Sequence, residues 1–495
     1  MRVRTPLVRL IPLAAAIFFV ASSASEAQAP PPLQQQARSI VDGVSGEWGV
    51  VAWSLDRNEI LFSINPHQVL VPASTNKIFT TVWALDRLGP DFRFHTDLLA
   101  TGAIEDGTLR GDLYLRGSGD PSFGYPDFTE DTMDPLREMA RRLAERGVRR
   151  VDGAVFGDGS AFDTTYMAAE WPASAAGGSA AYAPRISGLA FQRNVVSIRV
   201  GPGNGETGLR LSPAVREVPV VDQTRAGGGR TFAVRHPDGD TIFVRGGVPP
   251  RGTDSYRVGV SRPVLMAAAA LHAALAEAGI EVRGRAREGR APEDAKLVHR
   301  HVSIPLSAML AKVNRDSDNF FAEQIFRATA FREAGLGSYT RGGSHLALHM
   351  IRHGGAREGE VYPTDGSGLS RLNRTSAHAL LSALVHAHNQ PWRDEFMGSL
   401  AVAGDPGGTM RRMFRGTPGE GRILGKTGFI NRVRGLVGYA PTADNERIAF
   451  VFLYNGGNAS GARNAQIDLG NLLAQYRRGA PPPAVEEDDD ADDDG

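Results

Sequence analysis

Two stretches near the N-terminal end are rich in apolar residues and predict β-strands at Trp48–Trp53 and Glu59–Ile64. The polar turn between them, Asp56-Arg57-Asn58, predicts that they form a hairpin. An apolar run with helical spacing then predicts a helix from about Ser74 to Leu88, which Gly89-Pro90 ends. The first elements predicted after residue 47 are therefore two strands and a helix.

A change of pattern separates the middle of the chain from its ends. From Phe92 to Arg300 short strands and glycine turns dominate, and after Arg300 helical patterns return. The pattern predicts an α/β (α+β) domain split by a β-rich insertion of about two hundred residues, with no internal repeat. The clearest predicted strands are Leu113–Leu115, Val151–Phe156, Val195–Val200, Phe232–Val234, Ile242–Val244, Ile423–Lys426, Arg434–Tyr439 and Arg447–Leu453. The predicted helices are Pro135–Arg146, Pro263–Ala278, Ser307–Asn314, Asn319–Arg332, Ser344–Arg352, Ser376–His388 and Ala465–Tyr476.

Residues 1–29 have the features of a secretory signal peptide. Arg2, Arg4 and Arg9 precede the apolar stretch Leu10–Ala21, and Ala27-Gln28-Ala29 offers a cleavage site. The apolar stretch is shorter than the about 20 residues that a membrane span needs, and a proline interrupts it. We therefore expect a periplasmic or secreted protein without an integral membrane anchor.

The other end, residues 479–495, combines prolines with an acidic run. Clustered like charges cannot bury apolar surface, which predicts a disordered acidic tail. A calcium- or partner-binding role for the tail stays open. The whole chain has 55 basic and 55 acidic residues, whereas the body without this tail and the first 29 residues carries about +6.

Composition narrows the chemistry that the chain can perform. The absence of cysteine excludes disulfides, thiolate metal sites, iron–sulfur clusters and a cysteine nucleophile. Only four of the 55 basic residues are lysines, namely Lys77, Lys296, Lys312 and Lys426. Arginine does not lose its proton in proteins, whereas a desolvated lysine does. The lysine positions therefore indicate where a removable proton is needed.

The first candidate group is Ser74-Thr75-Asn76-Lys77, where a loop enters the predicted helix. Residues three apart share a helix face, so the Ser74 hydroxyl and the Lys77 amine can touch. A neutral amine there can activate the serine as a nucleophile, and the free N–H groups of the first helical turn favour an oxyanion. No other lysine has a serine three residues before it.

The second candidate group is Ser317-Asp318-Asn319, at a break between two helical patterns. Ser317 can relay a proton there, and Asn319 can bind a substrate amide. Alone this group is weak evidence, because Ser63-Ile64-Asn65 matches the same pattern on a predicted strand, and a helix N-cap also explains Ser317.

The third candidate group, Lys426-Thr427-Gly428, lies on a predicted strand. The cation and the hydroxyl suit a substrate carboxylate, Gly428 permits close approach, and the N–H of Phe429 offers a second oxyanion donor. Taken alone, Lys77 is also explained as a surface lysine, and Lys426 as a charge at the end of a strand. Three groups in this order, each on the expected type of element, predict an active site.

Together these groups resemble the signatures Ser-x-x-Lys, Ser-x-Asn and Lys-Thr-Gly of the penicillin-recognising serine D,D-peptidases. The long gap from Lys77 to Ser317 resembles the class C low-molecular-mass penicillin-binding proteins, the D-alanyl-D-alanine carboxypeptidase/endopeptidase family. The resemblance extends over about residues 40–475. Further similar segments are Leu115–Pro121, Tyr182-Ala183-Pro184, Asp365–Arg371 and Gly407–Met410.

The resemblance implies a fold and a division into domains. The fold is a serine β-lactamase/D,D-peptidase-like domain of antiparallel sheet with helices, interrupted by a β-rich two-domain insertion. The implied bounds are 30–91 and 300–478 for the catalytic domain I, 92–188 and 258–299 for the inserted domain II, and 189–257 for the small β domain III.

The resemblance also implies an acyl-transfer reaction on peptidoglycan. Ser74 attacks the carbonyl of a D-Ala-D-X bond, water releases the acyl-enzyme, and penicillins acylate the same serine and stay. Arg371 and Asp158 match the family's positions for recognising the zwitterionic tip of diaminopimelate, for which an ordinary surface ion pair is the alternative explanation. Phe429 replaces a common Thr or Ser, so a hydroxyl contact with substrate is lost.

The expected partners are peptidoglycan stem peptides and β-lactam antibiotics, without nucleic acid and without a cofactor; a homo-oligomer stays open. His345, His349 and His353 share one helix face, but no carboxylate completes a His-Glu-x-x-His pattern, so no metal site is predicted. Two alternatives remain: a related β-lactamase, amidase or esterase, and a non-catalytic cell-wall-binding protein that retains the fold.

Overall fold

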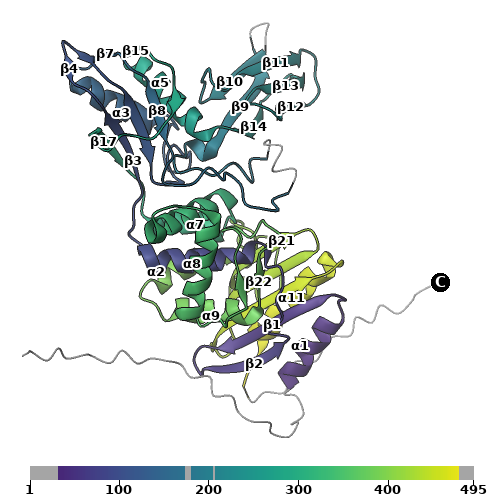
Figure 1. Ribbon diagram of the computed structural model, residues 1–495. Coiled ribbons are helices and arrows are strands. Elements are labelled where there is room, and N and C mark those ends of the chain that lie inside the picture. The colour runs from purple at the N-terminus through teal and green to yellow at the C-terminus, as the bar shows by residue number, and fades with distance from the viewer. Residues whose placement is uncertain (1–31, 173–179, 204–206, 479–495) are drawn as a thin grey trace, which may run out of the picture.

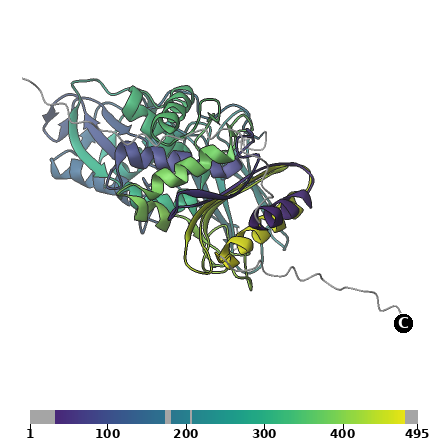
Figure 2. The same cartoon turned by 90° about the horizontal axis from the view of Figure 1, so that it is seen from below.

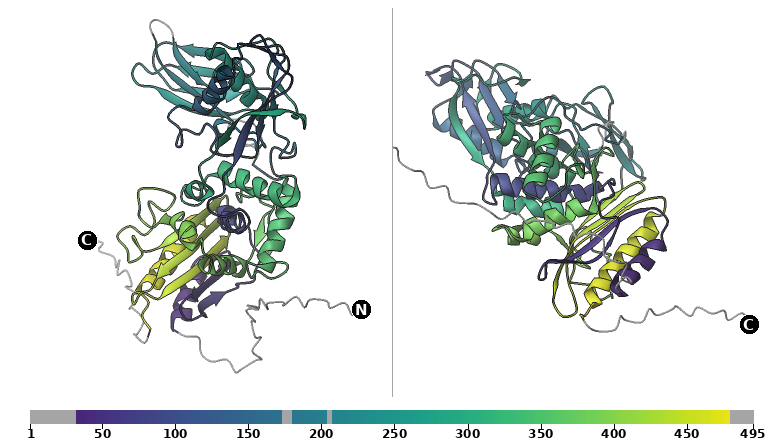
Figure 3. Two further views of the ribbon diagram at one scale, coloured as in Figure 1. Left: turned by 90° about the vertical axis from the view of Figure 1, so that its left-hand side faces the viewer. Right: turned by 60° about the horizontal axis from the view of Figure 1, so that its bottom comes forward.

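The computed structural model describes residues 32–172, 180–203 and 207–478. The predicted signal peptide and the predicted acidic tail lie outside these ranges. The described chain forms two lobes joined by a narrow waist (Figures 1 and 3). One lobe contains the predicted insertion, and the other combines the two ends of the described chain.

The lower lobe of Figure 1 is built on a six-stranded antiparallel sheet. The hairpin β1–β2 confirms the prediction from the N-terminal pattern, and β1 pairs with β23 from the other end of the chain. The sheet therefore joins segments that the insertion separates in sequence. Its order is β2 (Glu59–Ile64), β1 (Glu47–Ser54), β23 (Arg447–Asn455), β22 (Val433–Pro441), β21 (Leu424–Ile430) and β20 (Ala401–Val402).

Helices cover both faces of this sheet. α1 (Pro32–Asp42) and α11 (Ala459–Gln475) lie side by side on one face, in purple and yellow in Figure 2. On the other face α9 contacts β1 and β23 and packs against α2. The helices of this second layer are α2 (Lys77–Leu88), α6 (Leu306–Asn314), α7 (Asn319–Ala334), α8 (Tyr339–Arg352), α9 (Ala377–His388) and α10 (Arg393–Gly398), with the short strands β18 (Val361–Tyr362) and β19 (Arg374–Thr375) beside them.

α2 runs through the middle of the second helical layer, where it contacts α6, α7, α8 and α9. Nine of its twelve residues are buried, and Phe79 and Trp83 are fully enclosed. Close packing of this kind leaves little freedom for the helix to shift. Because α2 begins at Lys77, the hydrophobic core fixes the position of the candidate base.

The upper lobe is the β-rich insertion. Its helices α3 (Asp134–Glu145) and α5 (Pro263–Glu277) pack against each other, and its strands form four small sheets. The first two sheets are β16 (Arg287–Glu288), β8 (Val155–Asp158), β6 (Leu113–Gly117), β3 (His95–Ala100), β17 (Lys296–Val302), and β15 (Glu281–Val282), β7 (Arg150–Val151), β5 (Thr108–Leu109), β4 (Ile104–Glu105). The others are β10 (Thr207–Ser212), β9 (Val195–Pro202), β14 (Asp254–Gly259), and β11 (Val220–Arg225), β13 (Ile242–Gly247), β12 (Thr231–Arg235).

The strand predicted at Val151–Phe156 is wrong as one element. It consists of β7 and β8, which belong to different sheets. The chain turns at Gly153, whose N–H donates to the carbonyl of Gly111 at 3.0 Å, and a Cβ atom there would lie 2.4 Å from that oxygen. Only glycine permits this approach, so its presence within an apolar run is the sequence feature that divides the strand.

Two helices begin earlier than the apolar pattern predicts, because polar residues cap them. α8 starts at Tyr339 rather than Ser344, since the Ser338 hydroxyl accepts the Arg341 N–H at 3.1 Å. α11 starts at Ala459 and is capped by a side chain in the same way. An N-cap replaces a hydrogen bond that the first helical turn lacks, so it extends a helix beyond its apolar face.

The bounds predicted for domains I, II and III stay a prediction. The six-stranded sheet falls within the ranges expected for domain I, whereas β14 and β17 each run across one of the expected bounds. Among the residues described here, no helix combines the length and the apolar character needed to cross a membrane.

A buried arginine connects the insertion to the lower lobe of Figure 1. Arg327 on α7 is 0% exposed, and its guanidinium donates to the carbonyl oxygens of Asp163, Thr165 and Gly337 and to the Asp163 carboxylate at 2.8 Å. The ring of Phe162 lies 4.7 Å from the guanidinium carbon. This one side chain therefore holds residues 162–165 of the insertion against α7.

We expect Arg327→Ala to lower the free energy of unfolding by about 3 kcal/mol, because buried carbonyl groups and a carboxylate lose their donor. The matched control is Arg341→Ala, which removes an exposed arginine that donates to the Ala334 carbonyl. This control should cost less than about 0.5 kcal/mol. Urea unfolding followed by tryptophan fluorescence measures both variants, and equal losses would contradict the role given to Arg327.

Candidate active site

Ser74 lies on a single turn of 3₁₀ helix, Ala73–Asn76, that leads directly into α2. The predicted α-helix therefore starts three residues later than expected. In a 3₁₀ turn the side chains at i and i+3 eclipse each other, which aligns Ser74 with Lys77. The Lys77 Nζ lies 3.0 Å from the Ser74 Oγ, so the predicted contact is present.

The Lys77 amine has three oxygen neighbours, one of which is the candidate nucleophile. Besides the Ser74 Oγ, the Nζ contacts the Asn319 Oδ1 at 2.8 Å and the Ser367 carbonyl oxygen at 2.7 Å. These two oxygens only accept hydrogen bonds, so each requires an N–H from lysine. A neutral amine has two N–H groups for them, and its lone pair then faces the Ser74 hydroxyl. This arrangement suits proton abstraction from Ser74.

Burial makes the neutral form of Lys77 available. The side chain is 0% exposed, and desolvation lowers the pKa of its amine from 10.5 to about 8. The carboxylates of Glu323, Asp365 and Asp318 act in the opposite direction and limit this change in pKa. The neutral amine is therefore accessible near neutral pH.

Lys426 and Ser317 form a second lysine–serine pair beside the first. The Lys426 Nζ donates to the Ser317 Oγ and to the Thr427 carbonyl oxygen, each at 2.7 Å. Lys426 is also 0% exposed, and its burial, together with the charge of Lys77, lowers the pKa of its amine well below the usual value. The structure therefore brings both motif lysines and both motif serines into one site.

Strand β21 passes directly beside the turn that carries Ser74. A Cβ atom on Gly428 would lie 2.8 Å from the Pro72 carbonyl oxygen and 3.1 Å from the Thr75 nitrogen, so only glycine fits there. The following residue, Phe429, is 57% exposed, and the Arg434 guanidinium lies 3.9 Å from the centre of its ring. Phe429 therefore offers an aromatic surface rather than a hydroxyl group at this position.

Asp158 and Arg371 form no ion pair with each other in the described part of the chain. Asp158 is 2% exposed, and its two oxygens accept the N–H groups of Ser160 and Ala291, both at 2.9 Å. Arg371 is exposed and donates at 2.9 Å to the Asn431 carbonyl, in the turn between β21 and β22. Of the two predicted recognition residues, only Arg371 contacts the hairpin that carries Lys426.

Glu323 is a buried residue of the site that the motifs did not identify. Its carboxylate oxygens accept the N–H groups of Gly366 at 3.1 Å and Ser367 at 2.7 Å, which holds the Ser367 carbonyl against Lys77. Burial raises the pKa of the Glu323 carboxyl group, and the charge of Asp365 acts in the same direction. The available signal was that Glu323, followed by the polar Gln324, interrupts the apolar run from Phe320 to Phe326 in the predicted helix.

Asp365 organises the same loop from the other side. Its carboxylate accepts the N–H groups of Gly368 and Ser370, both at 2.7 Å, and the Asn373 amide at 2.9 Å. The indole N–H of Trp171, from the insertion, donates to it at 2.9 Å. Asp365–Arg371 was among the segments that carry the family resemblance, although no role for Asp365 followed from the sequence.

The insertion also reaches the Ser317 group directly. The Asn319 side-chain amide donates to the Tyr182 carbonyl at 2.9 Å, and Arg193 forms an ion pair with Asp318 at 2.7 Å. Both side chains of this ion pair are largely buried. Asp318 also caps α7 by accepting the Phe321 N–H at 3.2 Å. The insertion therefore helps to position the second motif.

The loop at residues 365–370 fits the Ser74 turn too closely to admit a side chain at Gly368. This residue has φ +79°, and a Cβ atom there would lie 1.8 Å from the Ala73 carbonyl oxygen. We expect Gly368→Ala to displace the loop and to destabilise the fold by more than about 2 kcal/mol.

The matched control is Gly335→Ala, since Gly335 has φ +71° but open space around the position of a Cβ atom. It should show only the cost of the left-handed backbone, about 1 kcal/mol. Thermal unfolding followed by circular dichroism compares the two variants. A loss for Gly368→Ala no larger than that for Gly335→Ala would contradict the close fit.

The comparisons with known proteins agree on one family. Residues 35–476 match the D-Ala-D-Ala carboxypeptidase 3 (S13) family. A D-alanyl-D-alanine carboxypeptidase of an Actinomadura species is 32% identical over 451 residues, which cover 86% of this chain and 81% of that protein. The D-alanyl-D-alanine carboxypeptidase DacB of Haemophilus influenzae is 27% identical over 432 residues, which cover 82% of this chain and 85% of that protein.

A solved structure has the same fold. The crystal structure of penicillin binding protein 4 from Haemophilus influenzae superposes with a TM-score of 0.75 and 25% sequence identity, covering 89% of this chain and 99% of that chain. This confirms the predicted fold class, and the family match confirms the resemblance drawn from the three motifs. The chain belongs to the D-Ala-D-Ala carboxypeptidase 3 (S13) family, within the class C low-molecular-mass penicillin-binding proteins.

Proposed function

We propose that this chain is a serine D,D-peptidase that cleaves D-Ala-D-Ala ends and D-Ala–diaminopimelate cross-links of peptidoglycan. The proposal depends chiefly on the buried Lys77 amine, whose Nζ lies 3.0 Å from the Ser74 Oγ. A desolvated lysine in contact with a hydroxyl is a base that can create a nucleophile. The family and the two carboxypeptidase relatives support the substrate class.

Acylation begins when the Ser74 oxygen attacks the carbonyl carbon of the penultimate D-Ala. The proton of the Ser74 hydroxyl moves to the Lys77 Nζ, whose other two N–H groups stay on Asn319 and Ser367. Negative charge develops on the substrate carbonyl oxygen. The backbone N–H groups of Ser74, at the start of a helical turn, and of Phe429, on β21, are the proposed donors to this oxygen.

Departure of the leaving group requires a proton on its amine nitrogen. The Ser317 hydroxyl donates this proton and recovers one from Lys426, whose Nζ lies 2.7 Å from the Ser317 Oγ. The bond between carbonyl carbon and nitrogen breaks, and an ester with Ser74 remains. The proton that Lys77 took from Ser74 passes through solvent to Lys426, which leaves the Lys77 amine neutral again. Lys77 then takes a proton from the water that attacks the ester and returns it to the Ser74 oxygen as the ester bond breaks, which restores the free enzyme.

Substrate binding involves the groups around the reacting atoms. The Thr427 hydroxyl and Lys426 bind the carboxylate of the terminal residue. Arg371 binds the carboxylate of the diaminopimelate tip, because it is exposed and contacts the β21–β22 turn. Asp158 has both oxygens engaged by backbone N–H groups, so its part in recognising the tip depends on substrate replacing one of them.

β-Lactams acylate Ser74 by the same attack, and the related Haemophilus influenzae protein has a crystal structure in complex with a β-lactam. The lifetime of the acyl-enzyme separates the alternatives that the sequence left open. A β-lactamase releases the acyl group rapidly, and a non-catalytic wall-binding protein does not form it.

The remaining expectations belong to the same proposal. The chain acts outside the cytoplasm, after removal of residues 1–29, because its substrate is the cell wall. Domain I carries the chemistry, and the inserted domains II and III position the second motif through contacts such as that between Arg193 and Asp318.

We expect Ser74→Ala to abolish covalent labelling by a fluorescent penicillin and the release of D-alanine from a pentapeptide. The control is Ser63→Ala, in the other Ser-x-Asn match on β2, which should label like the unchanged protein. Gel fluorescence and a D-alanine assay measure the two activities. Labelling that persists in Ser74→Ala would refute the mechanism, and rapid loss of label from the unchanged protein would favour a β-lactamase.

The acylation rate should rise about tenfold between pH 7 and pH 9 and then level off, because Lys77, with a pKa of about 8, must lose its proton to act as the base. Lys77→Arg should lose at least about a hundredfold in rate at every pH, since arginine stays protonated. The exposed Lys296→Arg is the control and should keep the full profile. Stopped-flow acylation measures the profile, and a rate independent of pH from 6 to 10 would contradict this role of Lys77.

A further inference from the structure

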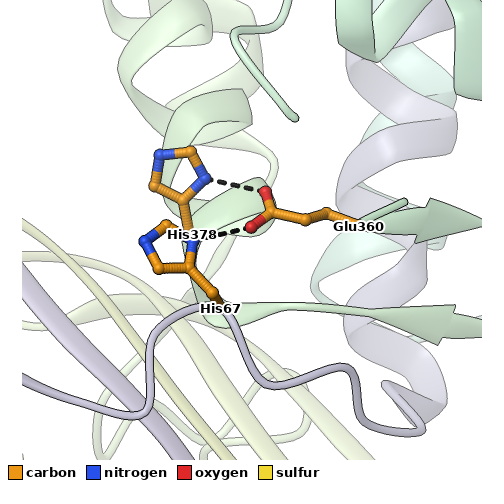
Figure 4. A group of neighbouring side chains, drawn as sticks. All are labelled: His67, Glu360 and His378. Atoms are coloured by element: carbon orange, nitrogen blue, oxygen red, sulfur yellow. Dashed lines mark hydrogen bonds and ion pairs between the residues drawn. The ribbon is translucent and has the colours of Figure 1, made fainter. Parts of the chain in front are cut away.

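Two histidines and a glutamate meet on the side of α9 that faces the loop after β2 (Figure 4). The Nδ1 of His67 lies 2.7 Å from one oxygen of Glu360, and the Nδ1 of His378 lies 2.8 Å from the other. The ring centres of the two histidines are 4.7 Å apart. The ligand atoms of the three residues all lie within 4.8 Å of one another, so they converge on one small volume.

The backbone holds these three residues together independently of their side chains. The His378 N–H donates to the Pro66 carbonyl at 2.8 Å, next to His67 in sequence. The Ser376 N–H donates to the Glu360 carbonyl at 3.2 Å. The cluster is therefore organised in advance, which reduces the loss of conformational freedom when a ligand binds.

An isolated β-bridge joins the segment that follows His67 to the segment that precedes His378. Leu70 and Thr375 exchange backbone hydrogen bonds of 2.8 and 2.9 Å. The segment from His67 to Pro72 then leads straight into the turn that carries Ser74. The cluster thus lies at the start of the segment that leads to Ser74. Within the part of the chain that the structure describes, its side chains form no hydrogen bond with Ser74 or Lys77.

The chemistry of the cluster suits a divalent transition metal. Two imidazole nitrogens and one carboxylate are a common ligand set for zinc, cobalt and nickel. The Glu360 side chain is 7% exposed and the His378 side chain 11%, whereas that of His67 is 44% exposed. An ion could therefore enter from solvent beside His67 and keep water at its open positions.

A second cluster in the same lobe has the same residue types in a different arrangement. His349 and His386 both place their Nε2 against a single oxygen of Asp86, at 2.7 and 2.8 Å. Among the described residues, the ligand atoms of this second cluster do not converge within 4.8 Å of one another as those of the first cluster do. In the first cluster each histidine contacts its own carboxylate oxygen, so the two Nδ1 atoms and the carboxylate surround one volume that a single ion can occupy when it replaces these hydrogen bonds.

We propose that His67, Glu360 and His378 bind a divalent transition-metal ion of the zinc class through the two Nδ1 atoms and the Glu360 carboxylate. The proton now on each Nδ1 moves to Nε2 or to solvent as the ion takes its place. The ion stabilises the segment that leads to Ser74 and takes no part in the acyl transfer. This site is independent of the proposed peptidase activity.

The test uses the full chain without a histidine tag, freed of metal by a chelator. We expect isothermal titration with Zn²⁺ to show one site of micromolar or tighter affinity, and Co²⁺ to give the visible absorption of a site with nitrogen ligands. His67→Ala should weaken Zn²⁺ binding at least tenfold. Because His67 is half exposed, this variant should fold, which circular dichroism checks.

The matched control is His345→Ala. His345 is 39% exposed and lies 3.0 Å from a buried glutamate, Glu333, in an arrangement like that of His67 and Glu360. It should bind Zn²⁺ like the unchanged protein. Zn²⁺ should also raise the melting temperature of the unchanged protein, but not that of His67→Ala, and leave the rate of penicillin labelling within about twofold.

Three results would overturn the site: no micromolar binding by the unchanged protein, equal binding by His67→Ala, or an equal loss in His345→Ala. In each case the cluster is a hydrogen-bonded contact between the loop and α9. These readouts do not use peptidase activity, so failure of the metal site and failure of the proposed function are distinguishable.

Discussion

Two lysine side chains, Lys77 and Lys426, are fully buried within one site, and the surrounding structure has to make that burial tolerable. An unpaired buried cation costs several kcal/mol, and two neighbouring cations also repel each other. Desolvation lowers the pKa values of both amines, and the charge of Lys77 lowers that of Lys426 further. Because burial disfavours the charged form, it also makes a neutral Lys77 amine accessible beside Ser74, as the proposed mechanism requires.

Besides the motif residue Asn319, groups outside the three motifs support Lys77. Its carbonyl partner belongs to Ser367, and that carbonyl is held in place by Glu323 and Asp365 through backbone N–H groups of the loop. The carboxylates also keep the pKa of Lys77 from falling further. The balance between desolvation and these acids sets the pKa near the pH at which a base works well.

The insertion contacts the candidate active site through three side chains or carbonyl groups. Trp171 donates to Asp365, the Tyr182 carbonyl accepts from Asn319, and Arg193 pairs with Asp318. Each contact restrains a group of the Ser317 motif or of the loop that carries the Ser367 carbonyl. A rigid second layer of this kind keeps reacting atoms in position, which is why a large insertion can lie between two motifs without separating their functions.

Histidines illustrate what spacing in sequence can and cannot indicate. His345, His349 and His353 follow one another at helical spacing, which places them on one face. In the fold, however, His345 contacts Glu333 and His349 contacts Asp86. The convergent cluster instead takes its members from three distant segments. Helical spacing describes one face of one helix, and it contains no information about which loops pack against that face.

The sequence by itself determined the elements and contacts that depend on near neighbours. The β1–β2 hairpin, the helix after Ser74 and the contact of Ser74 with Lys77 follow from local periodicity, turn residues and the geometry of a helical turn. Tertiary structure alone decided that β1 pairs with β23, that Glu323 supports the Ser367 carbonyl, and that Asp158 and Arg371 have separate partners. These contacts join residues far apart in the chain, and they form only because burial of the shared core brings the segments together.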